Sequence, residues 1–196
     1  MKLTLFTSLL LFAVCLFSGC DQSDDVTPEP TVFVNTFNGK IFGEPTVYAS
    51  GKDNFQARSG LWQGGGESFA EIGLETPSQT AGDLQLVVNS KIIASPLTSE
   101  RSKELFAVGA KSGEGNFAGF HVVFRRNGQT YSTVGGDQPV NFLEVTKLEE
   151  LPTDPRYQEF NFKVVFKING NLYQYGAPHG YAGKIENGEL VAYYLR

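Results

Sequence analysis

The sequence contains two histidines, His121 and His179, which are its main general-base candidates. His121 lies in Gly119-Phe120-His121-Val122 and alternates with apolar residues. We therefore interpret it as an outward or edge residue of a strand rather than as a catalytic base. His179 lies in the loop segment Ala177-Pro178-His179-Gly180, and loops on rigid scaffolds often carry functional groups. We therefore name His179 as a tentative binding residue. The two histidines are 58 residues apart, which is not a zinc-ligand spacing.

The single tryptophan, Trp62, is followed closely by Gly64-Gly65-Gly66. An exposed Trp62 could stack on a sugar ring or anchor a partner, because aromatic residues dominate binding hot spots. A buried Trp62 would instead fill the core beside neighbours that must be small. Both interpretations stay open, and Trp62 joins His179 as a tentative binding residue. No Gly-Lys-Ser/Thr follows the glycines, so they do not form a phosphate-binding loop.

Hydrolase signatures are missing from the sequence. The segment Lys111-Ser112-Gly113-Glu114-Gly115 does not match the Gly-x-Ser-x-Gly turn that presents a nucleophilic serine. Glycoside hydrolysis needs two carboxylates that face one cleft. Candidate acids exist, but any domain of this size offers as many, and a solvated strand face is the better explanation; they are Glu67, Glu71, Asp137 and Glu144. The sequence therefore identifies no catalytic residue, no metal site and no cofactor.

The elements that must position these side chains are strands. The composition is rich in glycine, with 22 residues, and in aromatic residues, at 13%, which favours strands and tight turns. The clearest strand is Glu159–Ile168, where Phe160, Phe162, Val164, Phe166 and Ile168 fall on one face. Further strands are expected at residues 31–37, 46–50, 54–59, 69–75, 84–89, 120–124, 140–148 and 189–195. One segment, Leu97–Val108, could instead form two helical turns, although no capping box supports them.

Asn-Gly pairs are typical of two-residue hairpin turns, because a type I′ turn needs positive φ at both central residues. The chain has four: Asn38-Gly39, Asn127-Gly128, Asn169-Gly170 and Asn187-Gly188. With about ten strands and clean alternation, they predict an all-β domain, an antiparallel β-sandwich or barrel.

The first 30 residues differ from this pattern. Lys2 precedes an apolar run from Leu3 to Phe17, which is shorter than the roughly 20 residues of a transmembrane helix and has the length of a signal-peptide core. Leu16-Phe17-Ser18-Gly19-Cys20 resembles the lipobox of bacterial lipoproteins, with Phe17 where an aliphatic residue is usual. This resemblance implies cleavage before Cys20 and lipidation of its thiol. We expect a signal peptide at residues 1–19, a lipidated Cys20 with a tether to residue 30, and one β domain at 31–196.

The tether, residues 21–30, carries four acids and no base. Its Ser23-Asp24-Asp25 is similar to the acidic surface-export signal of Bacteroidota lipoproteins, which implies display on the cell surface; an orientation toward the periplasm is the alternative. Of the net charge of −5, the domain after residue 30 contributes only −2, with 17 acids against 15 bases. A nucleic-acid partner is therefore not expected.

The whole layout resembles small Bacteroidota outer-membrane lipoproteins with a single β domain of unknown function. The features that carry the resemblance are the lipobox, the acidic tether, Phe37-Asn38-Gly39-Lys40 near the start and Ile185–Tyr194 near the end. The resemblance implies a membrane partner through the lipid anchor and supplies no catalytic residue. We expect a non-catalytic binding or accessory module with a protein or glycan partner. The alternatives are a surface hydrolase acting on glycans or peptides, and a calycin-like barrel with an apolar ligand cavity.

Overall fold

The structure is a computed structural model that describes residues 32–52, 54–64, 67–77, 85–92, 98–112, 120–152, 161–176 and 180–195, apart from the side chains of 61–69 and 89–92. The chain divides into two units, Met1–Val32 and Phe33–Arg196. Every element below belongs to the second unit.

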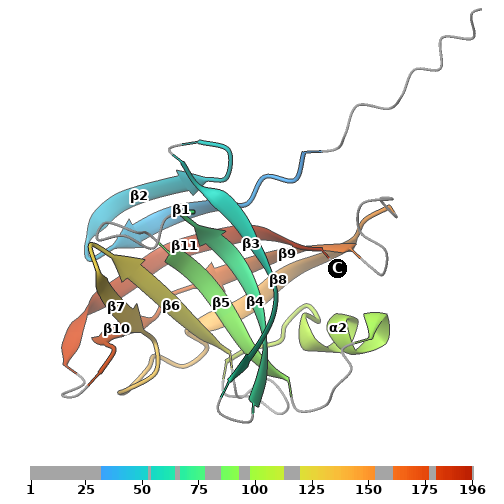
Figure 1. The fold of residues 1–196 in the computed structure, drawn as a ribbon. Helices are drawn as coiled ribbons and strands as arrows, with labels where there is room; N and C mark the ends of the chain where they lie inside the picture. The colour runs from blue at the N-terminus through green and yellow to red at the C-terminus, as the bar shows by residue number, and fades with distance from the viewer. Residues whose placement is uncertain are drawn as a thin grey trace, which may run out of the picture. The chain divides into compact units, whose positions relative to one another are not determined.

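The described part of the chain forms eleven strands and one short helix (Figure 1). In chain order these are β1 (Thr36–Ile41), β2 (Glu44–Ala49), β3 (Gln56–Gly64), β4 (Glu67–Glu75), β5 (Gln85–Ile92), α2 (Ser99–Leu105), β6 (His121–Arg126), β7 (Gln129–Ser132), β8 (Leu143–Glu150), β9 (Asn161–Ile168), β10 (Asn171–Gln174) and β11 (Tyr181–Leu195). All strand pairs are antiparallel. The all-β prediction is confirmed.

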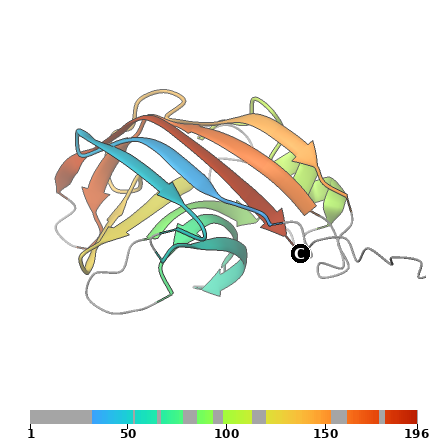
Figure 2. The same cartoon turned by 90° about the horizontal axis from the view of Figure 1, so that it is seen from above.

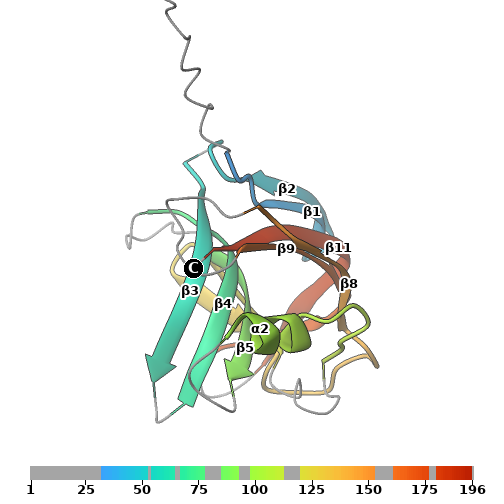
Figure 3. The same cartoon turned by 90° about the vertical axis from the view of Figure 1, so that its right-hand side faces the viewer.

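The strands follow the order β2-β1-β11-β10-β7-β6-β5-β4-β3, and β9 and β8 branch from β11. The long strand β11 therefore pairs with three neighbours. Its first residues pair with β10, its last eight pair with β9, and β1 runs along the other side of it. Figure 2 shows β1, β11 and β9 lying side by side. Strand β11 therefore connects β1, β2, β8 and β9 to the part of the sheet that runs from β10 to β3. The whole sheet curls into a nearly closed, barrel-like shape (Figure 3).

Side chains rather than a strand ladder close the gap between the end of β11 and the strands β3 and β4. Ser59 Oγ accepts a hydrogen bond from the Leu195 N–H at 2.9 Å and donates to the Leu195 carbonyl at 3.3 Å. Asn35, which is fully buried, donates through Nδ2 to the Gly73 carbonyl and accepts from the Tyr193 N–H at 2.9 Å. These side-chain hydrogen bonds satisfy backbone N–H and C=O groups where the strand ladder is incomplete.

The interior is filled by the apolar faces of the strands. Phe162, Val164, Phe166 and Ile168 are all fully buried, as the alternation in this segment predicts. Aromatic rings meet across the interior: Phe106 lies with its ring centroid 5.5 Å from Tyr194 and 6.2 Å from Phe166. Where these rings lie the barrel is packed, so the calycin-like expectation of a central cavity does not hold there.

The Asn-Gly prediction is confirmed at only one of four positions. Asn127-Gly128, with φ of 54° and 74°, turns the chain between β6 and β7. Asn38-Gly39 lies inside β1, and the β1–β2 turn is Phe42-Gly43, with φ of 56° and 80°. Asn187-Gly188 lies inside β11, and Asn169-Gly170 links β9 to β10, which are not paired with each other.

The helical alternative for Leu97–Val108 is confirmed as α2. Thr98 caps its first turn, because its side chain accepts a hydrogen bond from the Arg101 N–H. A capping box is excluded because Arg101 occupies the position that Glu or Gln would need. Lys103 forms a 2.8 Å ion pair with Glu150 of β8, while Ser102 and Leu105 face the core.

Candidate ligand-binding cleft

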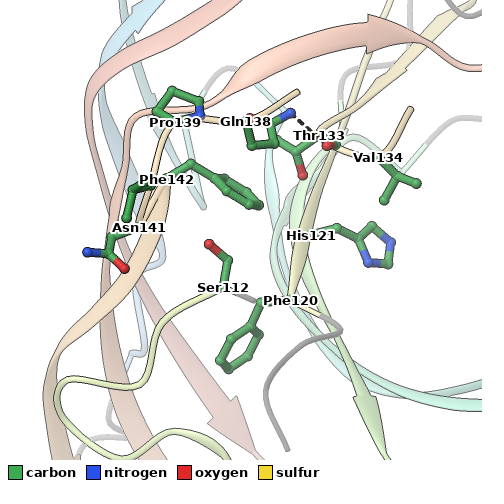
Figure 4. Close-up of a pocket in the computed structure, with 10 residues that line it drawn as sticks. Ser112, Phe120, His121, Thr133, Val134, Gln138, Pro139, Asn141 and Phe142 are labelled. Atoms are coloured by element: carbon green, nitrogen blue, oxygen red, sulfur yellow. Dashed lines mark hydrogen bonds between the residues drawn. The ribbon is translucent and has the colours of Figure 1, made fainter. Parts of the chain in front are cut away.

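A cleft of about 410 Å³ lies at the end of the barrel where β6 and β8 begin and β7 ends. Its lining includes Ser112, Phe120, His121, Thr133, Gln138 and Phe142 (Figure 4). The volume falls within the range of small-molecule sites in proteins. Segments distant in sequence meet here, so the cleft depends on the tertiary fold.

Backbone hydrogen bonds to the outer edge of β8 fix the position of Ser112. The Gly109 N–H donates to the Val145 carbonyl at 2.8 Å, and the Val145 N–H donates to the Ala110 carbonyl at 2.9 Å. The Ser112 N–H then donates to the Leu143 carbonyl at 2.9 Å. The segment 109–112 therefore acts as a short additional strand that carries Ser112 to the mouth of the barrel.

The opposite wall is held by two polar side chains whose hydrogen bonds are used within the fold. Thr133 Oγ1 accepts from the Val122 N–H at 2.9 Å. Gln138 Nε2 donates to the carbonyls of Thr133 and Asn171, and its Oε1 accepts from the Asn171 N–H at 2.8 Å. A side-chain amide has one acceptor and two donors. The Gln138 amide is therefore engaged in shaping the wall and does not point to a ligand.

Ser112 differs from these two residues because its hydroxyl has no hydrogen-bond partner in the part of the chain that the structure describes. The residue is only 8% exposed. Figure 4 shows its hydroxyl pointing into the cleft, toward the side formed by Phe142. A buried hydroxyl without a partner lowers the stability of the folded protein by about 1–3 kcal/mol. A ligand that hydrogen-bonds to this hydroxyl would remove the penalty.

The described lining of the cleft contains no Asp, Glu, Lys or Arg. His121 is its one titratable residue, and it is half-buried. It alternates with the buried Phe120 and Val122, as its phase in the sequence predicts. The strand interpretation of His121 is therefore confirmed, and the fold also brings it to the cleft.

Cys20 and His179 lie outside the described residues, and so does the Trp62 side chain, although the Trp62 backbone pairs with Phe69 in β3 and β4. The core-or-exposed alternative for Trp62 therefore stays open.

The three candidate acids whose side chains the structure describes, Glu71, Asp137 and Glu144, do not line the cleft. Glu71 is buried on β4, where Arg58 binds both it and Glu75. Asp137 is exposed, and its carbonyl accepts a 2.6 Å hydrogen bond from the Tyr173 hydroxyl. Glu144 lies half-buried on β8, while the Glu67 side chain is outside the described part. The described lining thus lacks the two facing carboxylates that glycoside hydrolysis uses.

Sequence reasoning considered Ser112 only as a nucleophile and missed its place in a cleft. The pairing of 109–112 with β8 that positions it has no local signature. Among the described residues, no group of three or more His, Cys, Asp or Glu side chains could hold a metal ion. Within the same ranges, no helix has the length and apolar character needed to cross a membrane.

No family model matches this chain, and neither a curated protein nor a solved structure was found to be similar to it.

Proposed function

We propose that this protein is a lipid-anchored envelope lipoprotein whose β domain is a non-catalytic binding module, with the cleft beside Ser112 as its binding site. The observation that carries the binding role is the buried Ser112 hydroxyl, which points into a cleft and has no partner in the described structure. The described lining supplies a buried hydroxyl that is available to a ligand and no pair of acids. This arrangement favours recognition over hydrolysis.

The anchor is supported by the residues around Cys20. An apolar run, two small residues and a cysteine stand in the order that lipoprotein processing requires. Several acyl chains would hold the protein on the membrane, because each buried methylene contributes about 0.8 kcal/mol. We further propose that Asp24 and Asp25 direct the domain to the cell surface.

The anchor is tested with Cys20→Ala. We expect this variant to lose incorporation of radiolabelled palmitate and to leave the membrane fraction, while unchanged labelling would overturn lipidation at Cys20. Surface display predicts that protease added to intact cells removes the domain, and that neutralising Asp24 and Asp25 as asparagines reduces this digestion. Protection in intact cells would instead place the domain on the periplasmic side.

The binding role is tested with a reporter on the rim of the cleft. Val140, which is 90% exposed, is replaced by Cys and coupled to an environment-sensitive nitrobenzoxadiazole dye in the full chain in nanodiscs. Three probes are titrated: 1-decanol, maltotriose and trialanine. A saturable change in emission without breakdown of the probe supports a binding module. Breakdown of maltotriose or trialanine, or no response to any probe, would overturn it. The control position is Val47 on β2, which is 72% exposed and not part of the cleft.

A further inference from the structure

We propose that the cleft binds an uncharged, single-chain amphiphile whose hydroxyl or carbonyl oxygen hydrogen-bonds to Ser112 Oγ. This inference rests on the proposed binding function and specifies the class of ligand. It follows from three properties of the cleft: one orphaned hydroxyl, apolar surfaces beside it and a lining without formal charge.

The orphaned hydroxyl sets the polar part of the ligand. Ser112 Oγ can donate one hydrogen bond and accept two, and none of these is used in the described structure. Thr133 and Gln138, on the opposite wall, are already engaged with backbone groups, and the Asn141 side chain is exposed to solvent. A single oxygen on the ligand therefore satisfies the site, whereas a sugar ring with several hydroxyls would bury groups without partners.

The described lining has no acidic side chain, Lys or Arg, which favours an uncharged ligand. None of the described lining residues is acidic or basic apart from His121. An ionised ligand head would lose its hydration without meeting an opposite charge, which is strongly unfavourable. An alcohol or ester oxygen loses much less hydration free energy than an ionised head when it enters the cleft.

The apolar part of the ligand has apolar side chains beside Ser112. The ring of Phe142 points into the cleft, whereas the Phe120 ring turns away from it into the core and packs against Phe106 and Phe166 (Figure 4). At the rim, Val134 is 58% exposed and Val140 is 90% exposed. Burial of a hydrocarbon chain against these side chains would provide most of the affinity, because apolar area removed from water is the dominant favourable contribution.

Ser102 on α2 provides a matched control for Ser112. Its hydroxyl is also buried and also lacks a partner in the described residues, but Ser102 does not line the cleft. Ser112→Ala and Ser102→Ala therefore make the same chemical change in a similar environment. Neither should destabilise the unliganded protein, since neither removes an existing hydrogen bond. Only Ser112→Ala should affect binding.

The experiment measures 1-decanol, decanoate and decylamine at pH 7 with the Val140→Cys reporter in the full chain in nanodiscs. We expect saturable binding of 1-decanol and at least about tenfold weaker binding of the two ions. Ser112→Ala should weaken 1-decanol binding by about three- to tenfold, the equivalent of one hydrogen bond. Ser102→Ala should leave it unchanged, and the thermal midpoints of both unliganded variants should be no lower than that of the parent.

The outcomes separate this inference from the proposed function. Equal 1-decanol affinity in the parent and in Ser112→Ala would overturn the role of Ser112 while the cleft remains a binding site. Tighter binding of decanoate or decylamine than of 1-decanol would overturn the uncharged ligand class. A response to maltotriose or trialanine but not to 1-decanol would overturn the inference and leave the binding function standing. A lower thermal midpoint for Ser112→Ala would show that its hydroxyl is a structural group.

Discussion

Asn169 Oδ1 accepts a 2.7 Å hydrogen bond from the backbone N–H of Asn187. Each of these residues begins an Asn-Gly pair, and a third pair lies beside them, because Gly39 packs against the backbone of Gly188. At this point two residues of β11, Asn187 and Gly188, oppose the single residue Gly39 of β1, and Asn187 has a φ of 49°. Such a β-bulge bends a strand. The three Asn-Gly pairs therefore lie together at the point where β11 stops pairing with β10 and begins to pair with β9.

Gly39→Ala should destabilise the protein by about 1–3 kcal/mol, the usual cost of overpacking. A Cβ at Gly39 would lie 2.7 Å from the Gly188 Cα, which is backbone and cannot move aside freely. Urea unfolding of the full chain measures the change. Gly60→Ala on β3 is the control, because a Cβ there meets nothing within 4 Å, and its effect should stay within about 0.5 kcal/mol. Equal effects of the two changes would contradict the close approach.

Asn35→Ala should lower the free energy of unfolding by about 2 kcal/mol or more. The change leaves the Gly73 carbonyl and the Tyr193 N–H without the partner that now joins them, and each orphaned buried group costs about 1–3 kcal/mol. Hydrogen exchange should also speed up at Tyr193. Asn38→Ala removes the same side chain from an exposed position on β1 and should be nearly neutral. Unchanged exchange at Tyr193 in Asn35→Ala would show that Asn35 does not close the barrel.

Arg58→Ala should destabilise the fold more than Arg126→Ala. Burial lowers the pKa of Arg58, but hydrogen bonds to Glu71 and Glu75 outweigh it and hold that pKa above its ordinary value. Removing the guanidinium would leave the buried Glu71 without its partner, at a cost of about 1–3 kcal/mol for this partly exposed pair. Arg126 pairs with Glu44 at an exposed site, where the loss should be below about 1 kcal/mol. Chemical denaturation of both variants provides the comparison, and a larger loss for Arg126→Ala would refute the assignment.

Tyr48→Phe should make the protein less sensitive to alkali. Burial raises the pKa of Tyr48 above its ordinary value of 10.0; Arg126 opposes this shift and Glu44 adds to it. The folded protein therefore holds the phenolic proton more tightly than the unfolded chain does. The resulting stabilisation is fully present below pH 10 and is lost as pH rises through the folded-state pKa.

The measurement is the free energy of unfolding between pH 8 and 11.5. It should fall less steeply above pH 10 in Tyr48→Phe than in the parent. Tyr175→Phe, at a position that is 70% exposed, is the control and should follow the parent. A steeper fall in Tyr48→Phe would reverse the sign of the proposed linkage.

The strand faces could be predicted from the sequence because alternation reports burial directly. Phe162 to Ile168 is correct residue by residue, and the His121 phase is correct for the same reason. The turn at Asn127-Gly128 was also predictable, because its two strands are neighbours in sequence and the turn alone sets their pairing.

The other Asn-Gly pairs could not be placed from local sequence. A residue at positive φ suits a bulge as well as a hairpin, and what distinguishes the two at Asn187 is the pairing of β11 with β1 from the far end of the domain. Ser112 was missed for a related reason. Its position depends on hydrogen bonds to Val145 and Leu143, residues that follow more than 30 positions later.

The position of β11 in the sheet also constrains how the domain can fold during synthesis. Its fifteen residues, Tyr181–Leu195, pair with β1, β9 and β10, so these strands have no common partner until residue 195 has left the ribosome. A nascent chain that stops short of β11 leaves one edge of β1 and one edge of β9 without their partner strand. Completion of the barrel is thereby delayed until translation has passed its last strand.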